Sequence, residues 1–129
     1  MYVHYAQFER DVIKRYAARF GDESHPVVEW LLNGGGLLDL REVVKRCLVL
    51  PTYGYGLKEG CKDSNLVNFQ WELTESGSQW SVVRYIDFLQ ANDEGEREEI
   101  KAEVLSYNRD DVRATRALEV WLGAIGASA

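Results

Sequence analysis

Two acidic side chains lie on helix faces that are otherwise apolar, and this constrains what the chain can fold into. On a helical wheel of residues 97–125, Asp111 and Tyr107 fall in the middle of a narrow apolar stripe. On a wheel of residues 5–20, Glu9 falls near the centre of the apolar face. An unpaired buried carboxylate costs several kcal/mol or takes up a proton. The two carboxylates are therefore expected to approach each other and share a partner, and a divalent cation suits oxygen ligands. The apolar residues are Ile100, Val104, Ala114, Leu118, Leu122 and Ile125 on the first wheel, and Tyr5, Phe8, Val12, Ile13, Tyr16 and Phe20 on the second.

Each of these acidic residues also has a structural interpretation, and spacing alone leaves both open. Asp111 is either a metal ligand or a core acid whose charge is satisfied by an arginine or a tyrosine hydroxyl. Glu9 is either a ligand or a first-turn glutamate, which the helix dipole favours. Tyr107 lies four residues before Asp111 on the same helix face and could orient an attacking water. Asp110 is expected to point about a quarter-turn away.

The periodicity predicts a mostly α fold with a small β component. A chain of 129 residues is expected to form a single domain, residues 1–129, with a substantial core. A short strand is expected in residues 1–4, and residues 66–73 are either a short strand or an apolar loop. Helices are expected over residues 6–20, 26–33, 40–48, 57–62, 79–90 and 96–124, the last bent near Asn108. The fifth of these helices is expected to have Val82, Val83, Ile86 and Leu89 on its apolar side.

The composition excludes some classes of protein. A net charge of −6 argues against a DNA-binding module that relies on broad positive potential, but not against a metal-dependent nuclease with an acidic site. No apolar run is long enough for a membrane span, and the first residues do not resemble a secretory signal, so we expect a cytoplasmic chain with no membrane partner. Cys47 and Cys61 are too few for a metal cluster and are predicted to be reduced.

Two shorter segments also have candidate roles. Asp39 precedes an expected helix and is interpreted as its N-cap. The loop at residues 53–58 combines aromatic residues, glycines and one cation. Such a loop can stack on bases through Tyr55 and contact a phosphate through Lys58, or it can simply be a packed turn.

Several motifs resemble those of one family. The segment Leu105–Leu118 resembles the third motif, Tyr-x-x-x-Asp, of ribonuclease H-like 3′–5′ exonucleases of the DEDDy type. Its longer pattern, Tyr-Asn-x-Asp-Asp-x-x-Ala-Thr-x-x-Leu, resembles the corresponding domain of predicted RecB-family nucleases. The segment His4–Glu9 is similar to the second motif, His-Asn-x-x-Phe-Asp, with Tyr for Asn and Glu for Asp. Leu38–Leu40 and Tyr55–Lys58 also resemble segments of that group, so the similarity covers nearly the whole chain.

The resemblance implies a nuclease that cleaves DNA or RNA with two divalent ions, Mg²⁺ or Mn²⁺. In that scheme Asp111 and Glu9 are metal ligands, and Tyr107 positions the nucleophilic water. Two ions about 3.5–4 Å apart would clamp the attacking and leaving oxygens of a phosphodiester.

The chain departs from the family in one respect. The first motif, Asp-x-Glu on an early strand, is absent, so the chain resembles the C-terminal part of an α/β ribonuclease H-like fold. We therefore expect weak or no activity from this chain alone, with a missing N-terminal segment or a homo-oligomer completing the fold. The absent strands are expected to leave an exposed apolar surface that drives association. The alternative is a non-catalytic helical binding or self-assembly module derived from a nuclease domain.

Overall fold

Two short parallel strands join the two ends of a helical arm. The computed structural model describes residues 1–72 and 78–128. Strand β1 (Tyr2–His4) pairs with β2 (Leu37–Asp39), placing Tyr2 beside Leu37 and His4 beside Asp39. The strand at the start of the chain was predicted, whereas β2 was not. A strand of three residues is too short to show an alternating pattern, so only its pairing with a distant segment reveals it.

Helices make up most of the described chain, as the sequence predicts. The predicted helices are present, with ends that differ by up to four residues. One helix runs without interruption through Asn108, where a bend was predicted. Residues 66–72 form the predicted apolar loop rather than a strand. Residue 73, the last residue of that predicted segment, lies outside the described residues. The helices are α1 (Phe8–Phe20), α2 (Pro26–Leu32), α3 (Leu40–Cys47), α4 (Leu57–Lys62), α5 (Ser78–Gln90) and α6 (Glu94–Ser128).

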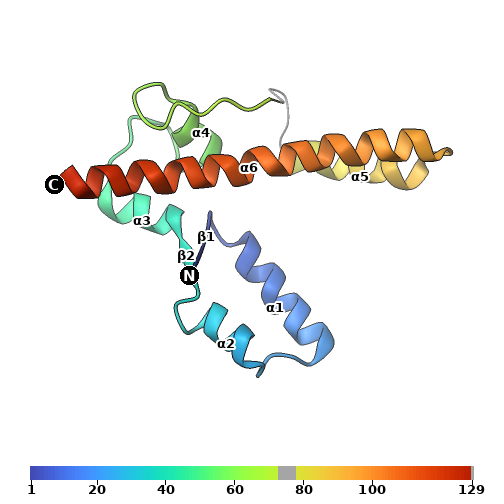
Figure 1. Ribbon diagram of the computed structural model, residues 1–129, viewed down its shortest axis with the longest axis horizontal. Helices are drawn as coiled ribbons and strands as arrows, with labels where there is room; N and C mark the ends of the chain where they lie inside the picture. Colours follow the sequence, from blue (N-terminus) through green and yellow to red (C-terminus); the bar gives the residue numbers. More distant parts are fainter. Residues whose placement is uncertain (73–77, 129) are drawn as a thin grey trace.

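The long helix α6 organises the molecule. Figure 1 shows α5 lying alongside the first half of α6, with α3 and α4 next to its second half. Helices α1 and α2 project together to one side and form what we call the arm. The arm is held together in part by Arg10, whose guanidinium donates a hydrogen bond to the Leu32 carbonyl.

The buried core lies where α3, α4 and the loop after α4 meet α6. This matches much of the predicted stripe on α6, since Ala114, Leu118 and, nearer α5, Ile100 are buried. Cys61 is buried and Cys47 exposed, and both thiols are free, as predicted. In the described part of the chain, no helix is both long and apolar enough to cross a membrane. The core cluster consists of Leu40, Val44, Cys61, Trp71, Ala114 and Leu118.

Two predicted apolar faces are partly or wholly exposed. On α1, Phe8, Tyr16 and Phe20 are exposed, Val12 and Ile13 are partly buried, and Ala17 is buried. On α5, the whole predicted apolar side, from Val82 to Leu89, is exposed. The wheel identified correctly which residues share a face, but it cannot show whether another element covers that face. Apolar side chains are thus exposed on these two helices, while the expectation of an uncovered surface where the absent strands would pack stays a prediction.

Candidate active site

Tyr107 and Asp111 lie one turn apart on α6, close enough to interact electrostatically. Burial first, and then the interaction with the negatively charged Asp111 carboxylate, raise the pKa of Tyr107 to about 12 from its ordinary 10.0. The phenol therefore stays protonated at neutral pH and acts as a hydrogen-bond donor.

Trp71 donates a hydrogen bond to the Asp111 carboxylate. Its Nε1 lies 2.9 Å from Oδ1 of Asp111, and its ring is buried in the core. This bond orients the Asp111 carboxylate on a partly buried helix face. Of the two interpretations left open by the sequence, this contact agrees with a core acid held by a side-chain donor, although the donor is Trp71 rather than an arginine or a tyrosine. The role of Asp111 as a metal ligand stays a prediction.

Asp110, which was predicted to point about a quarter-turn away from Asp111, is buried on its own side of α6. It is 2 % exposed, and its Oδ2 accepts a hydrogen bond of 2.8 Å from the Glu72 backbone N–H. Arg113 on the outer side of α6 lies 4.0 Å from the other oxygen. Asp110 therefore fastens the loop after α4 to α6, because that loop crosses the helix face on which Asp110 lies.

Two lysines of α4 lie over the aromatic side of this cluster. The ammonium of Lys58 is 5.0 Å from the ring centre of Tyr107 and 5.8 Å from that of Trp71. Lys62, one turn later, is 5.9 Å from the Trp71 ring. Burial lowers the pKa of Lys58, while the nearby Asp111 carboxylate opposes this shift. The structure thus places Lys58, a predicted phosphate contact, beside Tyr107 and Asp111.

Tyr55, the predicted base-stacking residue, serves as an anchor through its backbone. Its carbonyl accepts hydrogen bonds from the Tyr5 hydroxyl at 2.6 Å and from Nε of Arg41 at 3.3 Å. Its side chain is partly buried against the core. Tyr53, two residues earlier, is fully exposed and is the aromatic residue of this loop that a ligand could reach. Tyr53 was missed because spacing within a glycine-rich loop does not show which ring faces solvent.

Glu9 lies at the start of the arm and is paired with His4. Its Oε2 is 3.6 Å from Nδ1 of His4, a buried residue at the end of β1, and its side chain is half exposed. Glu9 and Asp111 thus have separate partners, and the structure does not place them in a shared site. Their predicted use of one ion stays a prediction.

Asp39, opposite His4 in the sheet, is the N-cap of α3, as predicted. Its Oδ1 accepts hydrogen bonds from the backbone N–H groups of Arg41 at 2.9 Å and Ala6 at 3.0 Å. The same atom therefore caps one helix and fixes the turn that leads into α1. Ala6 has a positive φ of 67° in that turn.

The donor set was compared with what a divalent ion requires. Within residues 1–72 and 78–128, no group of three or more His, Cys, Asp or Glu side chains is arranged to hold a metal ion. Mg²⁺ demands near-octahedral oxygen ligation and tolerates little distortion. The residues of this cluster therefore do not fit a two-metal centre by themselves, and Asp111 is at most part of one.

The chain was also compared with known proteins. A family model described as the RNase H superfamily matches residues 1–123. No curated protein and no solved structure matches. The matched region includes all the residues described above, from His4 to Arg113. The chain therefore belongs to the ribonuclease H superfamily.

Proposed function

We propose that this chain is part of a metal-dependent 3′–5′ exonuclease, of the DEDDy type found in predicted RecB-family nucleases. The observation that carries the proposal is the interacting pair of Tyr107 and Asp111, one turn apart on α6, within a chain of the ribonuclease H superfamily. A tyrosine one turn before an aspartate is the spacing of the third exonuclease motif. The substrate would be a phosphodiester of DNA or RNA.

Each residue of the cluster has a role in this proposal. Asp111 would present a carboxylate to a divalent ion, Mg²⁺ or Mn²⁺, and Glu9 would supply a second carboxylate after moving away from His4. Tyr107 would orient a water or a phosphate oxygen through its hydroxyl. It would not act as a general base, because its raised pKa keeps the phenol protonated. Lys58 would neutralise the charge of the bound phosphate.

We infer that this chain alone is weakly active or inactive. Glu9 and Asp111 provide two carboxylates, and Asp110 is engaged with the Glu72 backbone. A site that clamps both the attacking and the leaving oxygen needs further ligands. These would come from an additional segment that carries the Asp-x-Glu motif or from a second copy.

A second candidate function is a non-catalytic helical binding or self-assembly module. The observation that favours it is the exposed apolar side of α5, from Val82 to Leu89. Contiguous exposed apolar surface on a folded protein is typical of interaction sites. In this alternative the cluster around Asp111 would be purely structural.

The test is digestion of single-stranded DNA and RNA with Mn²⁺. We expect slow cleavage that is lost in Asp111→Asn and reduced in Tyr107→Phe, which keeps the ring but removes the hydroxyl. The matched control is Asp22→Asn, which makes the same chemical change in the exposed turn after α1. Circular dichroism of each variant establishes that the helices are intact.

Three outcomes would contradict parts of the proposal. Equal cleavage by the parent and Asp111→Asn would show that Asp111 takes no part in the reaction. Robust cleavage that is abolished in Asp111→Asn would show that the site is complete, within one chain or across a dimer. No cleavage, together with no change in the fluorescence anisotropy of a labelled oligonucleotide, would favour the binding or assembly module.

A further inference from the structure

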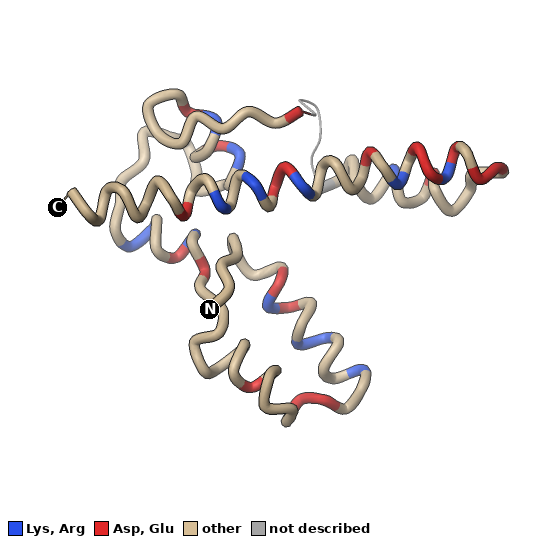
Figure 2. The backbone as a smooth tube through the Cα atoms, in the orientation of Figure 1, with Lys and Arg blue, Asp and Glu red and all other residues tan. Residues whose placement is uncertain are grey.

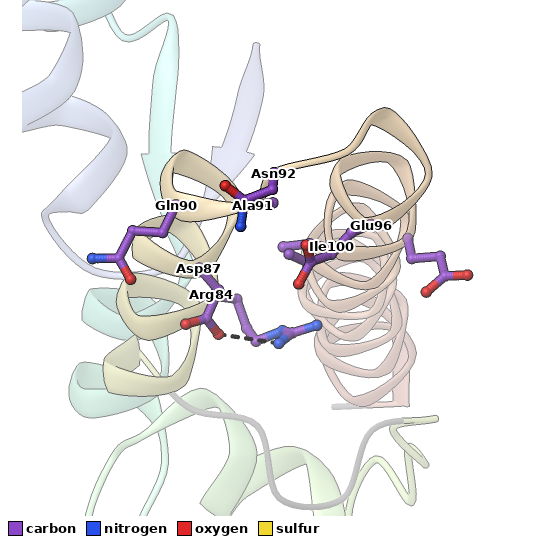
Figure 3. A pocket seen from close by; sticks show the side chains of 8 residues that line it. Arg84, Asp87, Gln90, Ala91, Asn92, Glu96 and Ile100 are labelled. Carbon is purple, nitrogen blue, oxygen red and sulfur yellow. Dashed lines mark hydrogen bonds and ion pairs between the residues drawn. The ribbon is translucent and has the colours of Figure 1, made fainter.

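Helix α5 faces α6 with both polar and aromatic side chains, including Trp80, whose ring centre lies 5.5 Å from that of Tyr107, and it leaves an apolar stripe exposed to solvent. Arg84 reaches from α5 toward α6, as Figure 3 shows, and its Nη2 lies 2.6 Å from Oε2 of Glu103. Its Nη1 lies 3.1 Å from Asp87 on the same helix. The opposite side of α5, which we call the hairpin stripe, consists of Val82, Val83, Ile86 and Leu89, and all four side chains are exposed. Covering such a stripe with another surface is favourable, because it removes apolar side chains from water.

An acidic pocket adjoins this stripe. The pocket has a volume of about 340 Å³ and lies between α5 and α6, with Glu96 turned toward α5 in Figure 3. Its lining contains three carboxylates and one guanidinium, so its net charge is negative. Val83 lies one turn before Asp87, which places the edge of the stripe beside the pocket. The lining residues are Arg84, Asp87, Gln90, Ala91, Asn92, Glu96, Glu99 and Ile100.

The arm carries a surface of complementary character. Phe8, Tyr16 and Phe20 are exposed on α1, and we call these three residues the aromatic arm face. Arg15 and Arg19 border the same side of the helix, and the Arg19 guanidinium lies 5.6 Å from the Phe20 ring centre. Neither arginine forms an ion pair with any of the residues that the structure describes. Figure 2 shows acidic residues at the start of α1, basic residues further along it, and acidic residues clustered in the first third of α6.

We propose that the arm of one copy of this chain docks on the α5–α6 hairpin of a second copy, and that the contact is reciprocal. The aromatic arm face covers the hairpin stripe, while Arg15 and Arg19 meet the carboxylates of Glu96 and Glu99. Charge complementarity points to a second copy, because the basic and the acidic surface belong to the same chain. Two identical contacts related by a two-fold axis close a dimer and leave no open end. This inference is independent of the nuclease proposal, since it uses neither Tyr107 nor Asp111.

The main test is a charge exchange followed by analytical ultracentrifugation. The arm variant is Arg15→Glu with Arg19→Glu, and the hairpin variant is Glu96→Lys with Glu99→Lys. Each variant alone brings like charges together, so its dimer dissociation constant should rise by about two orders of magnitude. An equimolar mixture of the two variants restores opposite charges at both contacts and should form a heterodimer. All four residues are exposed, and circular dichroism checks that each variant keeps its helices.

A second measurement tests the apolar part of the contact. Val82→Gln should raise the dissociation constant by about tenfold, because it places an amide within the covered stripe. Val120→Gln on α6 is the matched control, since Val82 is 59 % exposed and Val120 is 58 % exposed. The control should leave the dissociation constant unchanged.

The proposal is overturned by any of four results. These are a parent chain that stays monomeric throughout the micromolar range, a dimer that both charge variants leave intact, a mixture that fails to form heterodimers, and equal effects of Val82→Gln and Val120→Gln. The heterodimer in the mixture is the outcome that establishes arm-to-hairpin docking, because only complementary reversal of both surfaces restores it.

Discussion

The core around α6 and the arm differ in how their apolar residues are used. Around α6, side chains from α3, α4 and the following loop bury one another, and the cluster of Tyr107 and Asp111 lies beside them. In the arm, α1 has one buried residue, Ala17, and exposes three aromatic rings. The helices α6 and α1 are both amphipathic in sequence, so amphipathicity alone does not show that a helix face is covered within one chain.

Truncating one apolar side chain in each region should lower the stability of the protein by very different amounts. Leu118→Ala removes a side chain that is 5 % exposed and should lower the free energy of unfolding by about 2–5 kcal/mol. Phe20→Ala removes one that is 63 % exposed and should change it by no more than about 0.5 kcal/mol. Urea unfolding of dilute protein, followed by circular dichroism, measures both. Similar losses in the two variants would show that the arm is packed as tightly as the core.

A smaller effect is expected from the loop that crosses α6. Asp110→Ala removes the acceptor of the Glu72 N–H within the core and should cost about 1–3 kcal/mol. Asp63→Ala is the control, because its Oδ1 accepts a bond of the same length, 2.8 Å, from Asn65 in an exposed turn. Urea unfolding should show a clearly smaller loss for the control. If Asp63→Ala loses as much free energy of unfolding as Asp110→Ala, burial does not determine how much the Asp110 hydrogen bond contributes to stability.

A further effect concerns alkaline pH. Burial is the first cause that raises the pKa values of Tyr5 and Tyr107 from 10.0, and that of Cys61 from 9.0, all to about 12. The folded state therefore holds these protons more tightly than the unfolded state. Their contribution to stability is fully present below about pH 9 and is lost as the pH rises toward 12.

Thermal unfolding followed from neutral pH to about pH 11 should show this loss as a falling Tm. Tyr107→Phe should make the fall shallower, because it removes one of the three groups. A Tm that does not change with pH across this window would contradict the burial of these groups.

Sequence reasoning was most successful for local features. Helix positions, the N-cap at Asp39 and the neighbouring positions of Tyr107 and Asp111 follow from spacing within one segment. The burial of Asp110 and the strand β2 were not predicted, because the environment of each comes from distant parts of the chain. The Glu72 backbone reaches Asp110 across 38 positions, and β2 exists only through its pairing with β1. The same limit applies to Trp71, whose bond to Asp111 spans 40 positions.

The two hydrogen bonds to Oδ1 of Asp39 bear on how this domain can vary. The N–H groups of Ala6 and Arg41 both donate to this one atom, so the segments that enter and leave the arm are held together at a single point. We call this pair of hydrogen bonds the clasp. Changes in the length of α1 or α2 would then be absorbed beyond the clasp, since the cost of closing a longer loop grows slowly. Glu9 sits in the first turn after the clasp and would keep its place. The arm can thus be lengthened, shortened or exchanged during evolution while the cluster on α6 is preserved.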